Sequence, residues 1–155
     1  MKDAMIRNAR IEDAKTIHQM LNTFSERGAV LPRSLSEIYD HLRDYSVYCH
    51  GGAETIIGTC AIHVCWGDLA EIRSLAVSNG FAGRGIGRAM VEHCITQARE
   101  LGIHRVFALT YSTGFFEKMG FYAVDKASLP HKIWADCLKC AKFPDCDEVA
   151  MIREI

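Results

Sequence analysis

"EIRSLAVSNGFAGRGIGRAM", residues 71–90, is the stretch of the sequence that decides the fold. Residues 71–77 read as a β-strand, and apolar residues at helical spacing predict a helix over 84–101 that ends at Gly102. The turn between them is rich in glycine, which allows a ligand to approach the backbone closely. The first N–H groups of a helix lack partners, and together with the helix dipole they favour an anion such as phosphate. The stretch therefore predicts either a phosphate-binding loop or a plain turn ahead of a helix.

Two familiar phosphate-binding loops do not fit this glycine run. A Walker loop ends in Gly-Lys-Ser/Thr, whereas residues 87–89 read Gly-Arg-Ala. A dinucleotide fingerprint requires Gly-x-Gly-x-x-Gly at the start of a βαβ unit, whereas here the third glycine comes one residue early and the loop lies in mid-chain. If the loop does bind phosphate, Gly83, Gly85 and Gly87 supply the close approach, and Arg84 and Arg88 add charge.

Periodicity predicts further strands and helices on both sides of this stretch. Strands are expected at 4–9, 46–50, 55–66, 105–110, 121–124 and 148–155. Helices are expected at 11–24 and 114–120, and another begins at Ser34, which forms a capping-box pattern with Glu37. The order β-α-α-β-β-β-α-β-α-β-β predicts an α/β or α+β protein in which helices pack on a mixed sheet.

The composition is that of an ordinary globular protein. The chain has 155 residues, 49% of them hydrophobic and 24% charged, with a net charge of −1. We expect one domain spanning 1–155, with no bulk attraction to nucleic acid or to an anionic membrane. The charged N-terminus does not resemble a signal peptide, and no apolar run is long enough to cross a bilayer, so we expect a cytoplasmic protein.

Residues 71–95 and "FFEKMGF" at 115–121 together resemble the GNAT superfamily of acetyl-CoA-dependent N-acetyltransferases. The family loop, Arg/Gln-x-x-Gly-x-Gly/Ala, corresponds to residues 82–87, with Ala82 at the first position. The resemblance implies a mixed, mostly antiparallel sheet flanked by helices, with acetyl-CoA as co-substrate. It also implies that backbone groups of Leu75, Ala76 and Val77 pair with the pantetheine arm. The pyrophosphate would be held by the amides of Ala82, Gly83, Arg84, Gly85, Ile86, Gly87 and Arg88.

A narrower resemblance concerns the acceptor. Residues 61–77, 107–121 and 129–151 are similar to the short, stand-alone N-acetylglutamate synthases of bacterial arginine biosynthesis. This resemblance implies transfer of acetyl to the α-amine of L-glutamate. The alternatives are another small amine or a protein N-terminus as acceptor, and a non-catalytic module that senses acyl-CoA. A carboxylate base on the 71–77 strand favours the enzyme.

Cations are needed to hold a dicarboxylate acceptor. The planar fork of arginine matches a carboxylate, so Arg33 and Arg73 are candidates, and Lys132 is a third. Each could instead be a solvated surface charge. His63 and Trp66, near the end of a strand, either line the cleft or simply pack.

Glu71 is the candidate general base, because an amine that arrives as ammonium must lose a proton before it attacks. Its strand resembles the base-bearing strand of the histone-acetylating GNAT enzymes. The alternative is that Glu71 serves as an ion-pair partner of Arg73. Many relatives carry a tyrosine that protonates the leaving thiolate, but the matching residue here is Phe116. Tyr111 or solvent would have to take its place.

The cysteines divide into two groups. Cys49, Cys60, Cys65 and Cys94 lie in apolar runs and are expected to be buried and unreactive. Cys137, Cys140 and Cys146 lie in a cysteine-rich insertion at about 129–147 and suggest half of a zinc site. A fourth ligand is missing, apart from His131, Asp147 or Glu148, so we expect no metal. The insertion could instead form a lid or a contact in a homodimer.

Overall fold

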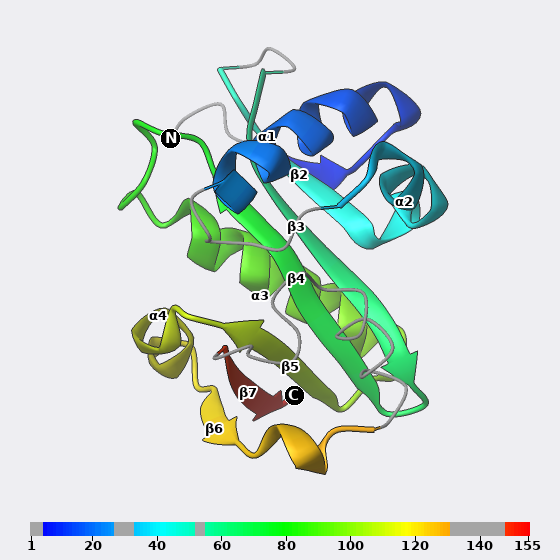
Figure 1. Ribbon diagram of the computed structural model, residues 1–155, viewed down its shortest axis with the longest axis vertical. Coiled ribbons are helices and arrows are strands. Elements are labelled where there is room, and N and C mark those ends of the chain that lie inside the picture. Colours follow the sequence, from blue (N-terminus) through cyan, green and yellow to red (C-terminus); the bar gives the residue numbers. More distant parts are fainter. Residues whose placement is uncertain (1–4, 27–32, 52–54, 131–147) are drawn as a thin grey trace.

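The computed structural model describes residues 5–26, 33–51, 55–130 and 148–155 (Figure 1). The strands are β1 (Met5–Asn8), β2 (Tyr45–His50), β3 (Thr55–Trp66), β4 (Leu69–Val77), β5 (Arg105–Thr110), β6 (Tyr122–Val124) and β7 (Val149–Glu154). The α-helices are α1 (Ala14–Glu26), α2 (Leu35–Asp40), α3 (Ile86–Glu100) and α4 (Thr113–Lys118). Short 3-10 turns are η1 (Ile11–Asp13), η2 (Leu42–Asp44) and η3 (Lys126–Ser128).

The predicted order of helices and strands is confirmed. The capping box is also present, since the Ser34 hydroxyl accepts from the Glu37 N–H at 3.1 Å and the Glu37 carboxylate accepts from the Ser34 N–H at 3.4 Å. The helix that follows is short, because α2 ends at Asp40 and Leu42 already belongs to η2. None of the helices in the described part of the chain has the length and apolar character needed to cross a membrane.

The strands form one mixed sheet in the order β1-β2-β3-β4-β5-β7-β6. Neighbouring strands are antiparallel except β4 and β5, which are parallel. The β4–β5 pairing includes only Ala70 with Val106 and Glu71 with Phe107. Beyond Glu71 the two strands diverge, as Figure 1 shows. The later half of β4 therefore has one edge that is not paired with β5.

A β-bulge in β4 coincides with this divergence. Arg73 pairs with Ala61 of β3 and Ala76 pairs with Thr59, so two β4 residues lie opposite one β3 residue. Ser74, within the bulge, has φ +58°, in the left-handed region that non-glycine residues rarely adopt. Its hydroxyl lies 3.4 Å from the buried Tyr45 hydroxyl, which anchors the bulge to β2.

The bulge reverses the alternation of side chains along β4, so that odd-numbered residues replace even-numbered ones on the α3 side of the sheet. Ahead of it, Ala70 and Ile72 pack in the core beneath α3. After it, Leu75 and Val77 pack against that same core, and Ala76 faces the opposite core beneath α1 and α2. Figure 1 shows α1 and α2 on one face of the sheet and α3 on the other.

The start of α3 is held tightly against β3. A Cβ at Gly58 would lie 3.3 Å from Ile86 Cγ2, so the absence of a side chain at Gly58 lets Ile86, the first residue of α3, approach the strand. This contact fixes the helix N-terminus beside the half of β4 that is paired with β3 but not with β5.

A buried ion pair joins β1 to η1. Both carboxylate oxygens of Asp13 accept from the Arg7 guanidinium, at 2.7 and 3.1 Å, and one also accepts from the Arg10 N–H at 2.7 Å. Burial by itself would raise the pKa of Asp13. The hydrogen bonds from Arg7 and Arg10 and their positive charges outweigh burial, so the pKa lies below its ordinary value of 3.8.

We therefore expect Asp13→Asn to lower the free energy of unfolding by about 1.5–3 kcal/mol at pH 7. A carboxyl with a lowered folded-state pKa stabilises the fold above pH 3.8 and loses that contribution as the pH falls further. The difference between the variant and the unmodified chain should thus shrink in urea unfolding below about pH 4. Glu12→Gln, at an exposed neighbour, is the control and should change little. Equal stability of Asp13→Asn and the unmodified chain at pH 7 would contradict this role.

Candidate active site

The divergence of β4 from β5 opens a groove of about 620 Å³ between β4, the glycine loop and α4. All residues predicted to bind the cofactor line it except Arg84. They are Leu75, Ala76, Val77, Ala82, Gly83, Gly85, Ile86, Gly87 and Arg88. The guanidinium carbon of Arg84 instead lies 5.2 Å from the centre of the Phe81 ring, on which it stacks.

The N-terminus of α3 opens into this groove. Gly85 is the N-cap residue, with φ +79°, and has no side chain to cap the helix. The first intrahelical bond runs from the Ala89 N–H to the Gly85 carbonyl at 3.0 Å, so the amides of residues 86–88 have no acceptor within the helix. Such amides, with the positive end of the helix dipole, form a site suited to an anion.

A smaller pocket of about 120 Å³ adjoins the groove. Leu75, Ser112 and Phe115 line both hollows, so a molecule in one would meet a molecule in the other at these residues. The small pocket brings together the predicted base Glu71 and the predicted cations Arg33 and Arg73. These three residues come from β4 and from the segment ahead of α2.

Both cations in the small pocket already have carboxylate partners. Arg73 Nη1 lies 3.5 Å from Glu71 Oε1, and the two side chains are only 9% and 10% exposed. Glu71 is thus an ion-pair partner of Arg73, as the alternative interpretation held, and it also lines the pocket. Arg33 Nη1 lies 3.5 Å from Glu37 Oε2. Burial would raise the pKa of Glu37, but hydrogen bonds from Ser34 and the nearby Arg33 lower it, so Glu37 holds its charge.

Sequence reasoning missed two residues of the pocket. Glu148, just ahead of β7, is 7% exposed and lines the pocket as a second buried carboxylate. It had been considered only as a metal partner of the nearby cysteines. Ser112, the N-cap residue of α4, lines both hollows. A signal for Ser112 existed, since a serine just ahead of a predicted helix is a typical N-cap.

Several other candidates lie away from the two hollows. Trp66 is 64% exposed and Tyr111 is 43% exposed, and neither lines the groove or the pocket. His63 is opposite Glu71 in the β3–β4 ladder, but its Nδ1 lies 2.7 Å from Asp44 and it lines a different hollow. Phe116, by contrast, does line the small pocket, but its side chain has no proton to give.

The cysteines behave as expected where they are described. Cys49, Cys60, Cys65 and Cys94 are buried. A hydrogen bond with Cys94 and burial both raise the pKa of the Cys60 thiol, so it is a poor nucleophile. Lys132, His131, Cys137, Cys140, Cys146 and Asp147 lie outside the described residues.

Comparison with known sequences is consistent with this geometry. The sequence pattern described as the acetyltransferase (GNAT) family matches residues 14–121. A Chlorobaculum tepidum protein named as an uncharacterized N-acetyltransferase is 42% identical over 153 residues, which cover 99% of this chain and 97% of that protein. An amino-acid acetyltransferase of Mycobacterium tuberculosis is 35% identical over 122 residues, which cover 78% of this chain and 70% of that protein.

Solved structures show the same fold. The N-acetylglutamate synthase of Neisseria gonorrhoeae, complexed with coenzyme A and N-acetyl-glutamate, has a TM-score of 0.87 at 29% identity; the match covers 97% of this chain and 35% of that one. The Mycobacterium tuberculosis protein Rv2747, in a complex that includes CoA, has a TM-score of 0.83 at 28% identity, and the match covers 97% and 99% of the two chains. The predicted mixed, mostly antiparallel sheet flanked by helices is therefore confirmed.

Proposed function

The chain belongs to the acetyltransferase (GNAT) family, is an N-acetyltransferase and uses acetyl-CoA, and from this premise we propose that it acetylates the α-amine of L-glutamate in arginine biosynthesis. One observation carries the proposal. The pocket that holds Glu71, Arg33 and Arg73 adjoins the groove beside the glycine loop. The names of the amino-acid acetyltransferase relatives, and the N-acetyl-glutamate bound by the Neisseria gonorrhoeae enzyme, support this acceptor.

Acetyl-CoA would lie in the groove with its pyrophosphate at the start of α3. The amides of residues 86–88 and the glycine loop would donate to the phosphates, and Arg88 would add charge. The pantetheine arm would then run along residues 75–77, where β4 is not paired with β5 and can accept a strand-like partner. This placement would bring the thioester to Leu75, Ser112 and Phe115, at the mouth of the small pocket.

In the proposed reaction, Glu71 takes a proton from the ammonium of the acceptor. The free amine attacks the thioester carbonyl, the C–S bond breaks as the amide forms, and the thiolate of coenzyme A leaves. The nitrogen loses its second proton in this step, and the thiolate gains one. Ser112, which lines both hollows, or solvent would relay that proton from the nitrogen to the thiolate. Glu148, the other buried carboxylate of the pocket, competes with Glu71 for the role of base.

A second candidate acceptor is a neutral amino acid such as L-glutamine. Because Arg33 and Arg73 each face a glutamate already, the pocket holds little unbalanced positive charge for an acidic side chain. For L-glutamate to bind, one of these ion pairs must open or be shared. A non-catalytic sensor is disfavoured, because two buried carboxylates line the pocket that adjoins the proposed coenzyme groove.

We expect Gly85→Val to weaken coenzyme A binding about tenfold or more. The valine side chain would keep the pyrophosphate away from the loop amides, and each charge-assisted hydrogen bond to these amides is worth about 1.5–3 kcal/mol. The substitution also strains the backbone, since Gly85 has φ +79°. Gly102→Val is the matched control. Like Gly85, Gly102 has a positive φ, of +86°, and a Cβ added there would have no atom within 4 Å. Gly102 lies beyond the opposite end of α3. Calorimetry should find affinity lost only in Gly85→Val. Equal affinity in the two variants, with both folded, would remove the loop from the coenzyme site.

We expect Glu71→Gln to lower kcat for acetyl transfer to L-glutamate by about 10²–10⁴-fold while coenzyme A affinity is kept. Glu148→Gln tests the competing carboxylate, and Glu100→Gln, at the exposed end of α3, is the control. Release of the coenzyme A thiol measures the rate. A large loss in Glu148→Gln with normal turnover in Glu71→Gln would transfer the role of base to Glu148. No acetylation of L-glutamate by the unmodified chain would refute the proposed function itself.

A further inference from the structure

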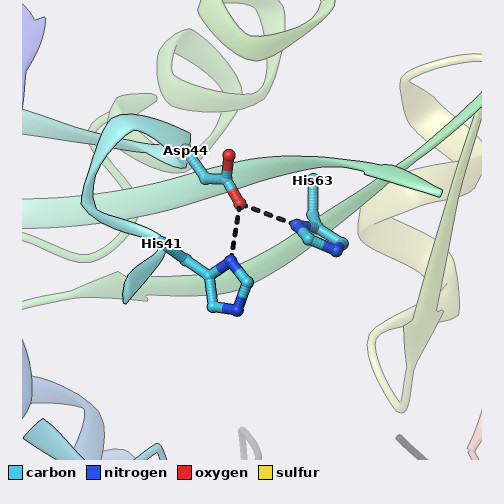
Figure 2. A group of neighbouring side chains, drawn as sticks. All are labelled: His41, Asp44 and His63. Atoms are coloured by element: carbon cyan, nitrogen blue, oxygen red, sulfur yellow. Dashed lines mark hydrogen bonds and ion pairs between the residues drawn. The ribbon is translucent and has the colours of Figure 1, made fainter. Parts of the chain in front are cut away.

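A cluster of two histidines and an aspartate lies outside the groove and the small pocket. His41 is the N-cap of η2, Asp44 is its last residue, and His63 lies on β3 (Figure 2). Both imidazoles turn their Nδ1 atoms toward the same carboxylate oxygen of Asp44, His63 at 2.7 Å and His41 at 3.8 Å. The cluster joins segments far apart in the chain, so sequence reasoning, which considered metal ligands only in and beside the cysteine-rich insertion, did not find it.

The three side chains offer a ligand set that suits zinc. One ligand atom from each residue can be chosen so that all lie within 4.8 Å of one another. Zinc binds histidine nitrogen and carboxylate oxygen at about 2.0–2.2 Å, which places tetrahedral ligands roughly 3.3 Å apart. Asp44 is somewhat too close to His63 for this geometry and somewhat too far from His41. Binding zinc would therefore require the side chains to rotate, and all three are partly exposed to solvent.

The surroundings leave the cluster open to an ion and to water. It borders a hollow of about 370 Å³ whose other charged lining residues are Asp40 and Arg43, of opposite sign. The side chains of His41, Asp44 and His63 are 45%, 26% and 23% exposed. An ion held by three protein ligands with one face toward solvent would complete its shell with water.

We propose that His41, Asp44 and His63 form a binding site for a divalent transition-metal ion, with Zn²⁺ as the best match to the ligands. Two neutral imidazoles and one carboxylate favour such ions over Mg²⁺ and Ca²⁺, which prefer oxygen ligands. The ion joins η2 to β3 and stabilises the fold by linkage to binding. It also lies beside the catalytic strand, because His63 pairs with Glu71 in the β3–β4 ladder.

The test measures Zn²⁺ binding directly, without relying on activity. The untagged full-length chain is stripped with a chelator and titrated with Zn²⁺ by calorimetry, alongside His41→Gln and Asp44→Asn. Loss of one ligand should lower the Zn²⁺ affinity of this site at least about 100-fold. Removal of residues that only hydrogen-bond to a metal ligand already lowers metal affinity about 10–100-fold. Each variant should therefore bind one Zn²⁺ fewer than the unmodified chain. His104→Gln, an exposed histidine outside the cluster, is the control and should bind as the unmodified chain does.

The cysteine-rich segment needs its own control, because thiolates also bind zinc. The titration is repeated in a chain with Cys137→Ser, Cys140→Ser and Cys146→Ser, where one Zn²⁺ should remain and should again be lost in His41→Gln. Co²⁺ in this background should give a visible spectrum without a thiolate charge-transfer band. The proposal is overturned if the triple variant binds no Zn²⁺, or if His41→Gln and Asp44→Asn bind as tightly as the unmodified chain.

Discussion

The pairing of β4 with β5 ends after two residue pairs, and the candidate active site depends on that early end. The bulge at Ser74, anchored by the buried Tyr45 hydroxyl, turns Leu75 and Val77 toward the α3 side of the sheet. The strand edge beyond Glu71 is not paired with β5, and the groove opens between this part of β4, the glycine loop and α4. Because Ile86 packs against Gly58, the uncapped start of α3 is fixed at the same groove. The early end of the β4–β5 pairing and the Gly58–Ile86 contact thus place the edge of β4 that is not paired with β5 beside amides suited to an anion.

The charges of the small pocket decide which acceptor fits. Two arginines and two buried glutamates line a space of about 120 Å³, and Arg33 reaches a further glutamate on α2. Under the proposed function, an acidic acceptor draws Arg73 or Arg33 to its own carboxylate and so opens one of the two ion pairs. If Arg73 is the one drawn away, Glu71 is released from that pair to take the proton of the ammonium, as we propose for L-glutamate.

Local patterns predicted the elements and the glycine loop well, and long-range placement was harder. The helical spacing of α3, the capping box at Ser34 and the glycines of the loop were all evident, because each depends on neighbours in the chain. The expectation that residues 75–77 line the cofactor groove came instead from the resemblance to the GNAT superfamily. The reversal of side-chain direction after Ser74 was not, since alternation in a sequence assumes a regular strand. Glu148 and the His41, Asp44 and His63 cluster were missed for a related reason. Each depends on which distant segments the sheet brings together, and the spacing of residues along the sequence does not indicate this.

The specificity constant for L-glutamate compared with L-glutamine tests the proposed function most directly. Acetyl-CoA consumption is measured with both acceptors for the unmodified chain, Arg33→Ala and, as an exposed control on α3, Arg99→Ala. Our account predicts that L-glutamate is preferred. It also predicts that Arg33→Ala raises the KM for L-glutamate about 30-fold or more, as expected for loss of a charge partner worth about 2–5 kcal/mol, with little change for acetyl-CoA. Faster turnover of L-glutamine by the unmodified chain, or an unchanged KM in Arg33→Ala, would contradict it.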